Sequence, residues 1–87
     1  MLASFIIRWH TRRIDNLLQS LRFMNLWHKD IISNSEIILI CQDSSYKIET
    51  AFKKTKCINM NSEEMYNSKQ TNLGIEASET DNIVMLD

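Results

Sequence analysis

Proline is absent from the 87-residue sequence, and glycine occurs once, at Gly74. Average usage gives about 4 prolines and about 6 glycines in a chain of this length. The scarcity of glycine excludes phosphate-binding loops of the P-loop and dinucleotide-binding types, because both need several glycines at fixed spacing. A phosphorylated ligand would therefore have to be bound by side chains and strand ends.

Long apolar runs are also missing. The longest, residues 37–41, has the length of a strand, far below the roughly 18 apolar residues that predict a membrane-spanning helix. The apolar stretch at residues 2–7 is too short for a secretory signal and is followed by arginines. We therefore expect a cytoplasmic protein, with a place at the membrane periphery as the other option. The length allows one domain, residues 1–87.

Charge is small in total but unevenly distributed. The net charge is −1, made up of five basic and two acidic residues in positions 1–30 and five basic and nine acidic residues in positions 31–87. This balance is not typical of a nucleic-acid-binding protein, so no nucleic-acid partner is expected. Cys41 and Cys57 both lie in apolar stretches, where a reduced thiol behaves as a small buried hydrophobe. Neither His10 nor His28 has metal-ligand spacing to them, which argues against a zinc site.

Apolar patterning predicts four strands alternating with three helices. The strands are expected at 2–7, 36–42, 56–60 and 82–87, and the helices at 12–26, 45–54 and 62–78. The apolar face of the first helix is formed by Ile14, Leu17, Leu18, Leu21 and Met24. The strand at 36–42 is apolar without alternation, which indicates burial on both faces. Gly74 lies inside the third helix, where glycine is unfavourable unless the helix packs closely against a strand.

The order βαβαβαβ predicts an α/β fold, a three-layer Rossmann-like half domain of four mainly parallel strands with helices on both faces. We expect the spatial strand order 3-2-1-4. Ligands of such sheets bind at the carboxyl ends of the strands. These ends are residues 8–11, 41–44, 59–61 and 87. They contain no nucleophile–base pair, but Asp43 and Asp87 are suited to contact a ribose or a divalent cation.

Four segments in order resemble the opening of family-2-type glycosyltransferases of the GT-A fold. Residues 12–21 (RRIDNLLQSL) are similar to the family's Asn-Arg-x-x-x-Leu-x-x-x-Leu, and residues 36–44 (EIILICQDS) to its Glu-Ile-Ile-Val-Val-Asp-Asp-Gly-Ser. Residues 72–77 (NLGIEA) resemble Arg-Asn-x-Gly-x-x-x-Ala, and residues 83–87 (IVMLD) the strand that delivers Leu-Asp-x-Asp. The resemblance covers essentially the whole chain, but only the nucleotide-sugar-binding half of such an enzyme.

The resemblance implies a nucleoside diphosphate sugar as the donor, for transfer to an unknown acceptor. The implied nucleotide-sugar-binding residues are His10, Thr11, Arg13, Gln42, Asp43 and Asp87. Asp87 corresponds to the first Asp of the Asp-x-Asp motif, whose second Asp holds a divalent metal, Mg²⁺ or Mn²⁺, on the diphosphate. Because that second Asp is missing, the metal motif is incomplete and this chain is not expected to bind the metal by itself.

No catalytic residue of the family is matched, because the catalytic base and the acceptor site lie beyond the matched segments. The resemblance thus implies a truncated reading frame or one piece of a longer glycosyltransferase, inactive alone. Two other interpretations stay open: a small non-enzymatic α/β nucleotide-binding or receiver-like module, and a purely structural module. A receiver-like protein needs paired acids after the first strand, where this chain has Arg8, Trp9 and His10.

Overall fold

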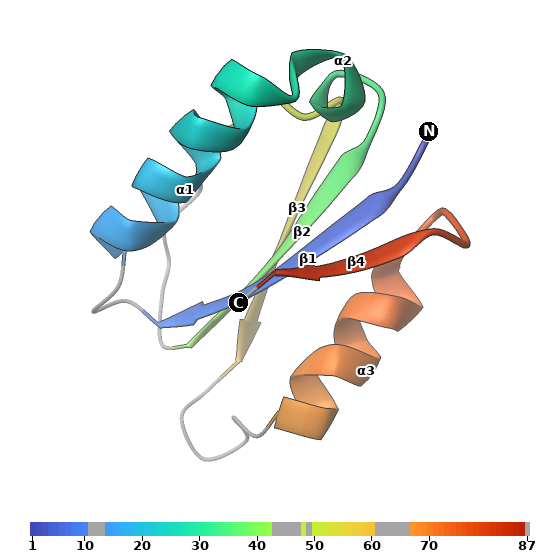
Figure 1. Cartoon of the computed structure of the whole chain (residues 1–87). Coiled ribbons are helices and arrows are strands. Elements are labelled where there is room, and N and C mark those ends of the chain that lie inside the picture. Colours follow the sequence, from blue (N-terminus) through green and yellow to red (C-terminus); the bar gives the residue numbers. More distant parts are fainter. Residues whose placement is uncertain (11–13, 43–47, 49, 61–66, 87) are drawn as a thin grey trace.

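The computed structural model describes residues 1–10, 14–42, 48, 50–60 and 67–86 (Figure 1). Its elements in chain order are β1 (Ser4–His10), α1 (Ile14–Trp27), α2 (Lys29–Ile32), β2 (Glu36–Gln42), β3 (Lys54–Met60), α3 (Asn67–Ala77) and β4 (Ile83–Leu86). The strands form one sheet in the order β3-β2-β1-β4, and every neighbouring pair is parallel. The predicted α/β class, parallel sheet and strand order are confirmed.

Helices lie on both faces of the sheet, α1 on one and α3 on the other (Figure 1). The core on the α1 face is formed by Ile7, Leu17, Ile32, Ile37, Leu39, Cys41 and Phe52. The core on the α3 face is formed by Ile6, Ile38 and Ile40, with Leu73 and Ala77 of α3 packed against them. Alternate residues of β2 therefore enter opposite cores, which explains why its sequence is apolar throughout.

The helix α1 packs with a narrower face than the sequence predicts. Leu17 is buried at 4% exposure, and Leu21 and Met24 pack against the same core. Leu18, by contrast, is 37% exposed, so its predicted place in the core is wrong. Each residue turns a helix by about 100°, and this rotation carries Leu18 off the stripe formed by positions 17, 21 and 24.

The bounds of three strands also differ from the prediction, since β4 begins at Ile83 and not at Asn82. β1 continues to His10, whereas the sequence predicts a loop from residue 8 onward; residues 8–10 pair in parallel register with residues 40–42 of β2. β3 begins at Lys54, two residues early, because Lys54 pairs with Glu36. Neither extension was predicted, because the sequence-based prediction places the end of a strand where the apolar residues stop.

The helix predicted at 45–54 is wrong in the part that the structure describes. Residues 50–53 are not helical; Thr50 Oγ1 accepts a hydrogen bond from the Phe52 N–H at 3.1 Å and lies 2.8 Å from Thr55 Oγ1. The single-turn helix α2 was not predicted, because four residues are too few to show a helical period. Within the described residues, no helix is long and apolar enough to cross a membrane.

Gly74 lies where α3 touches the sheet, as its place inside a helix suggests. A Cβ at this position would lie 2.8 Å from Ile6 Cγ2 and 3.2 Å from Ile40 Cδ1. Ile6 and Ile40 are completely buried, so neither can move aside without disturbing the core. The absence of a side chain therefore sets how closely α3 approaches β1 and β2.

We expect Gly74→Ala to lower the free energy of unfolding by about 1–2 kcal/mol, because overpacking costs about 1–3 kcal/mol and outweighs the better helix propensity of alanine. Urea unfolding followed by circular dichroism measures the change. Asn72→Ala, at an exposed position of the same helix, is the control and should change stability by about 0.5 kcal/mol or less. A Gly74→Ala protein more stable than the parent would contradict the close approach.

Candidate functional site

The carboxyl edge of the sheet is where the predicted site residues belong. His10 ends β1, Gln42 ends β2, and the two are paired in register. Leu86, the last residue of β4, pairs with Ile7 of β1, so β4 ends three positions before the level of His10. Asp87 is the next residue along the chain. The structure thus brings the backbones of His10 and Gln42 together at one edge.

The remaining predicted residues are known only through the strands they adjoin. Thr11, Arg13, Asp43 and Asp87 lie outside the described residues, as do the side chains of His10 and Gln42. Among the residues that the structure does describe, no group of three His, Cys, Asp or Glu side chains is placed to hold a metal ion. The predicted contacts to a nucleotide and a metal therefore stay predictions.

The order of the strands reverses at the centre of the sheet, beside the carboxyl end of β1. The chain passes from β1 to β2 to β3 in one direction and then crosses to β4 on the other side of β1. The connection from β1 to β2 contains α1 and the crossover from β3 to β4 contains α3, on opposite faces (Figure 1). The strand order therefore reverses between β1 and β4. Open α/β sheets bind their ligands at the carboxyl ends of the strands that flank such a reversal.

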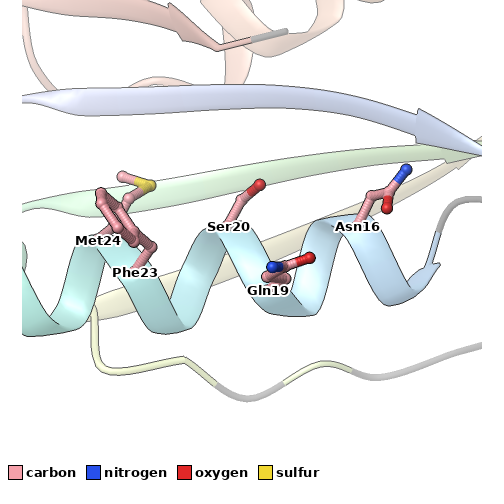
Figure 2. A pocket seen from close by; sticks show the side chains of 5 residues that line it. All are labelled: Asn16, Gln19, Ser20, Phe23 and Met24. Atoms are coloured by element: carbon pink, nitrogen blue, oxygen red, sulfur yellow. The ribbon is translucent and has the colours of Figure 1, made fainter.

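A pocket of about 410 Å³ lies elsewhere, along α1. Figure 2 shows its lining side chains on one helix: Asn16, Gln19, Ser20, Phe23 and Met24. Among the described residues, the lining comes from α1 alone and carries no charge. Because this pocket lies along a helix and not at the ends of the strands, it is not the candidate site.

The two cysteines differ in environment. Cys41 is buried on the α1 face, and its thiol donates a hydrogen bond to Asn59 Oδ1 on the neighbouring strand. Burial raises the pKa of the Cys41 thiol, which keeps it protonated and unreactive. Cys57 is exposed, so its predicted burial is wrong. It lies on β3, an edge strand of the sheet, where a residue can stay exposed to solvent even when the surrounding sequence is apolar.

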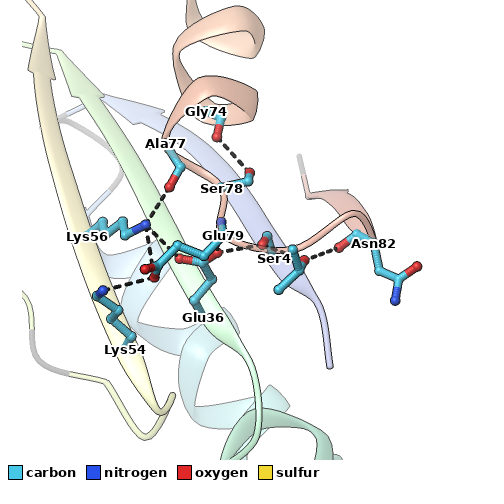
Figure 3. Close-up of polar contacts among 10 residues, drawn as sticks. Ser4, Glu36, Lys54, Lys56, Gly74, Ala77, Ser78, Glu79 and Asn82 are labelled. Atoms are coloured by element: carbon cyan, nitrogen blue, oxygen red, sulfur yellow. Dashed lines mark hydrogen bonds and ion pairs between the residues drawn. The ribbon is translucent and has the colours of Figure 1, made fainter. Parts of the chain in front are cut away.

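The opposite, amino edge of the sheet carries a polar cluster that the sequence analysis missed (Figure 3). We call Ser4, Glu36, Lys54, Lys56 and Glu79 the amino-edge cluster. Glu36, the first residue of β2, is 0% exposed. Its Oε2 accepts hydrogen bonds from Ser4 Oγ and from the Glu79 N–H, both at 2.6 Å, and its Oε1 lies 3.0 Å from Lys56 Nζ.

Lys56 joins this carboxylate to the end of α3. Its ammonium group donates a hydrogen bond to the carbonyl oxygen of Ala77 and lies 3.3 Å from Glu79 Oε2. Glu79 in turn accepts a hydrogen bond from Lys54 Nζ at 2.9 Å, in an exposed pair. The register of β2 and β3 brings the two lysines beside Glu36, because Lys54 pairs with Glu36 and Lys56 with Ile38. The alternation of Lys54 and Lys56 on one face was the only signal in the sequence.

The buried Glu36 and its half-buried partner Lys56 are both held in their ionised forms. Burial alone raises the pKa of Glu36, but the hydrogen bonds from Ser4 and Glu79 and the ion pair with Lys56 outweigh it and lower the pKa. Burial alone lowers the pKa of Lys56, but Glu36 and Glu79 outweigh it and raise the pKa. Glu36 is completely buried; its Oε2 accepts two hydrogen bonds and its Oε1 is reached by the Lys56 ammonium group in an ion pair, so the carboxylate is not available as a base or a metal ligand.

Stability should therefore fall at both ends of the pH range. The lowered pKa of Glu36 contributes stability above its ordinary value of 4.5, and this is lost as the pH falls through the lowered pKa. The raised pKa of Lys56 contributes stability below its ordinary value of 10.5, and this is lost as the pH rises through the raised pKa. Urea unfolding across pH should show a plateau between these values. A protein that gains stability below pH 4.5 would contradict the assignment.

Comparison of the chain with family models, curated proteins and solved structures gives no match.

Proposed function

We propose that this chain is the nucleotide-sugar-binding half of a glycosyltransferase with the GT-A fold. The observation that carries the proposal is the reversal of strand order between β1 and β4. His10 ends β1, and Asp87 follows directly on β4. The four segments that resemble the family fall on α1, β2, α3 and β4 of this arrangement. The topology and the sequence resemblance thus favour the same edge of the sheet.

Each strand end has a role in this proposal. Gln42, the last residue of β2, and Asp43 contact the base, and Asp87, after β4, faces the ribose. His10, the last residue of β1, binds the remainder of the nucleotide together with Thr11 and Arg13, and Arg13 supplies positive charge. In the reaction the bond from the sugar to the diphosphate breaks and a bond to an acceptor oxygen forms, with the acceptor proton going to a base outside this chain.

The divalent metal belongs to the longer enzyme. Asp87 supplies a single carboxylate, and a Mg²⁺ site on a substrate diphosphate uses one or two carboxylates together with the phosphates. When bound, the metal would neutralise charge on the leaving diphosphate. The 87-residue chain lacks the second Asp of the motif, so we expect it to show no sugar transfer.

The isolated chain should bind nucleoside diphosphates only at millimolar concentration or more weakly. A polypeptide prepared to end at Asp87 carries its terminal carboxylate beside the Asp87 side chain. Each additional like-charge pair near 4 Å costs about 1–4 kcal/mol, which corresponds to about one to three powers of ten in affinity. Isothermal titration with UDP and GDP, with and without Mn²⁺, measures the binding. We expect little improvement by the metal.

A chain extended by two residues to restore Asp-x-Asp is the decisive comparison. The extended chain should bind a nucleoside diphosphate in a Mn²⁺-dependent manner, and its Asn counterpart at the second Asp should not. Micromolar, metal-dependent binding by the 87-residue chain would mean that other residues form the site. If the extension changes nothing while nucleotides still bind, the chain is instead a nucleotide-binding module outside this enzyme class.

A further inference from the structure

The strand β4 has little apolar support. Its four residues pair with β1 along one side only, whereas β2 pairs with seven residues of β1 and seven of β3. No residue of β4 is fully buried: Ile83 and Leu86 are partly buried against the two cores, and Val84 and Met85 are 36% and 39% exposed. A segment that buries so little apolar surface opens more readily than the centre of the sheet.

Polar contacts instead hold the segment that enters β4. The Glu79 N–H donates to Glu36 Oε2 at 2.6 Å, and the Ser4 N–H donates to the Asn82 carbonyl at 2.8 Å. Ser4 Oγ lies 2.7 Å from Thr80 Oγ1. Ser4 and Glu36 are both completely buried. Figure 3 shows these contacts gathered where residues 78–82 cross the amino ends of β1 and β2.

Glu36 is the centre of this arrangement, because the three described groups that contact its carboxylate are all donors or cations. Ser4 Oγ and the Glu79 N–H point at one oxygen and the Lys56 ammonium at the other. A carboxylate has acceptors on both oxygens, whereas an amide has one acceptor and one NH₂ group. No orientation of a glutamine can therefore satisfy both sides, and one donor would face the NH₂ group.

From these contacts we infer that Glu36 is a positioning residue. Its buried carboxylate ties residues 78–82 to β1 and β2 and so sets the place of β4, the strand that leads to Asp87. Only one part of this inference rests on the proposed function, namely the role of Asp87 in binding a nucleotide. Without the carboxylate, β4 detaches from β1 while β1, β2 and β3 stay paired.

Hydrogen exchange followed by NMR tests this without any ligand. The measurement is the exchange rate of β4 amides relative to β2 amides, in the parent chain and in Glu36→Gln. We expect the ratio to rise about tenfold in the variant, since a hydrogen bond to a charged group is worth about a factor of ten or more. Glu36→Asp, which keeps the charge, should restore part of the protection in β4.

Two controls separate positioning from general loss of stability. Lys54→Ala removes only the exposed pair with Glu79 and should leave the ratio unchanged. Ile58→Ala weakens the core from β3, at the far edge of the sheet, and should not accelerate β4 more than β2. If Glu36→Gln does not fold, Ser4→Ala serves in its place and should raise the ratio about threefold.

An unchanged ratio in the folded Glu36→Gln or Ser4→Ala protein would overturn the inference, as would the same selective rise in either control. Full exposure of the β4 amides in the parent chain would overturn it as well. Because no nucleotide is present, these outcomes are independent of the proposed function, which is tested separately by titration with nucleotides.

Discussion

Replacing Lys56 with methionine should lower the free energy of unfolding by about 2–4 kcal/mol, somewhat below the range for fully buried ion pairs. The substitution keeps the apolar stem but removes the only cation beside Glu36 Oε1 among the described residues. Glu36 is completely buried, so its charge would lose its partner without gaining water. We expect a smaller loss of free energy than for a fully buried ion pair, because the Lys56 side chain is 24% exposed. Urea unfolding at pH 7 measures the change.

A double variant distinguishes a lost charge partner from lost packing. Glu36→Gln combined with Lys56→Met leaves no buried charge, so the pair of changes should cost less than the sum of the two single changes. Lys54→Ala is the matched control, because its pair with Glu79 is exposed and such pairs contribute about 1 kcal/mol or less. Strict additivity of the two single losses would show that Lys56 and Glu36 do not interact.

Leu17→Ala should also destabilise the chain strongly, by about 2–5 kcal/mol. Leu17 is 4% exposed and packs among Ile7, Ile37 and Leu39 of the sheet. Truncation removes buried methyl groups and leaves a cavity that the neighbouring strands cannot fill without moving. A domain of 87 residues has a total stability of only about 5–10 kcal/mol, so this variant should be partly unfolded at 37 °C.

Leu18→Ala is the matched control for Leu17→Ala, because it removes the same atoms from the next residue of α1. Leu18 is 37% exposed, and we expect a loss of about 1 kcal/mol or less. Both variants are compared by the midpoint of urea unfolding. Equal losses, or a larger loss at Leu18, would mean that α1 is rotated about its axis relative to the arrangement described here.

The parts of the fold that the sequence predicted are those with a strong apolar signal. The bounds of β2 agree at both ends, because residues 37–41 are apolar and are flanked by polar residues. Gly74 predicted close packing of α3, and the distance from its position to Ile6 bears this out. The strand order was predicted from the alternation of strands and helices and from the strand at 37–41, which is apolar on both faces, and it is confirmed.

The parts that were missed depend on which residues become neighbours across strands. The extension of β1 to His10 is set by pairing with β2, and no local pattern marks it. Glu36 looked like an ordinary start of a strand, although its burial depends on Ser4, Lys56 and Glu79, which lie far apart in the sequence. Contacts of this kind require the register, which a single sequence does not contain.

The candidate site was predictable as an edge of the sheet but not as a set of contacts. Residues 10 and 42 end neighbouring strands in register, as the parallel order requires. The roles of Thr11, Arg13, Asp43 and Asp87 rest on the family resemblance and on the chemistry of their side chains. Loops at strand ends often carry functional residues but have weak sequence patterns. The topology therefore predicted where these loops lie but not how their side chains are arranged.

The central claim is that a nucleoside diphosphate binds at the carboxyl edge of the sheet, and amide chemical shifts test it most directly. The chain labelled with ¹⁵N is titrated with UDP and GDP and with their sugar conjugates to tens of millimolar. We expect shifts for the amides of His10, Gln42 and Leu86, and unchanged amides for Ser4 and Glu36 at the amino edge. Shifts confined to the amino edge or to α1, or none with any of the four ligands, would contradict it.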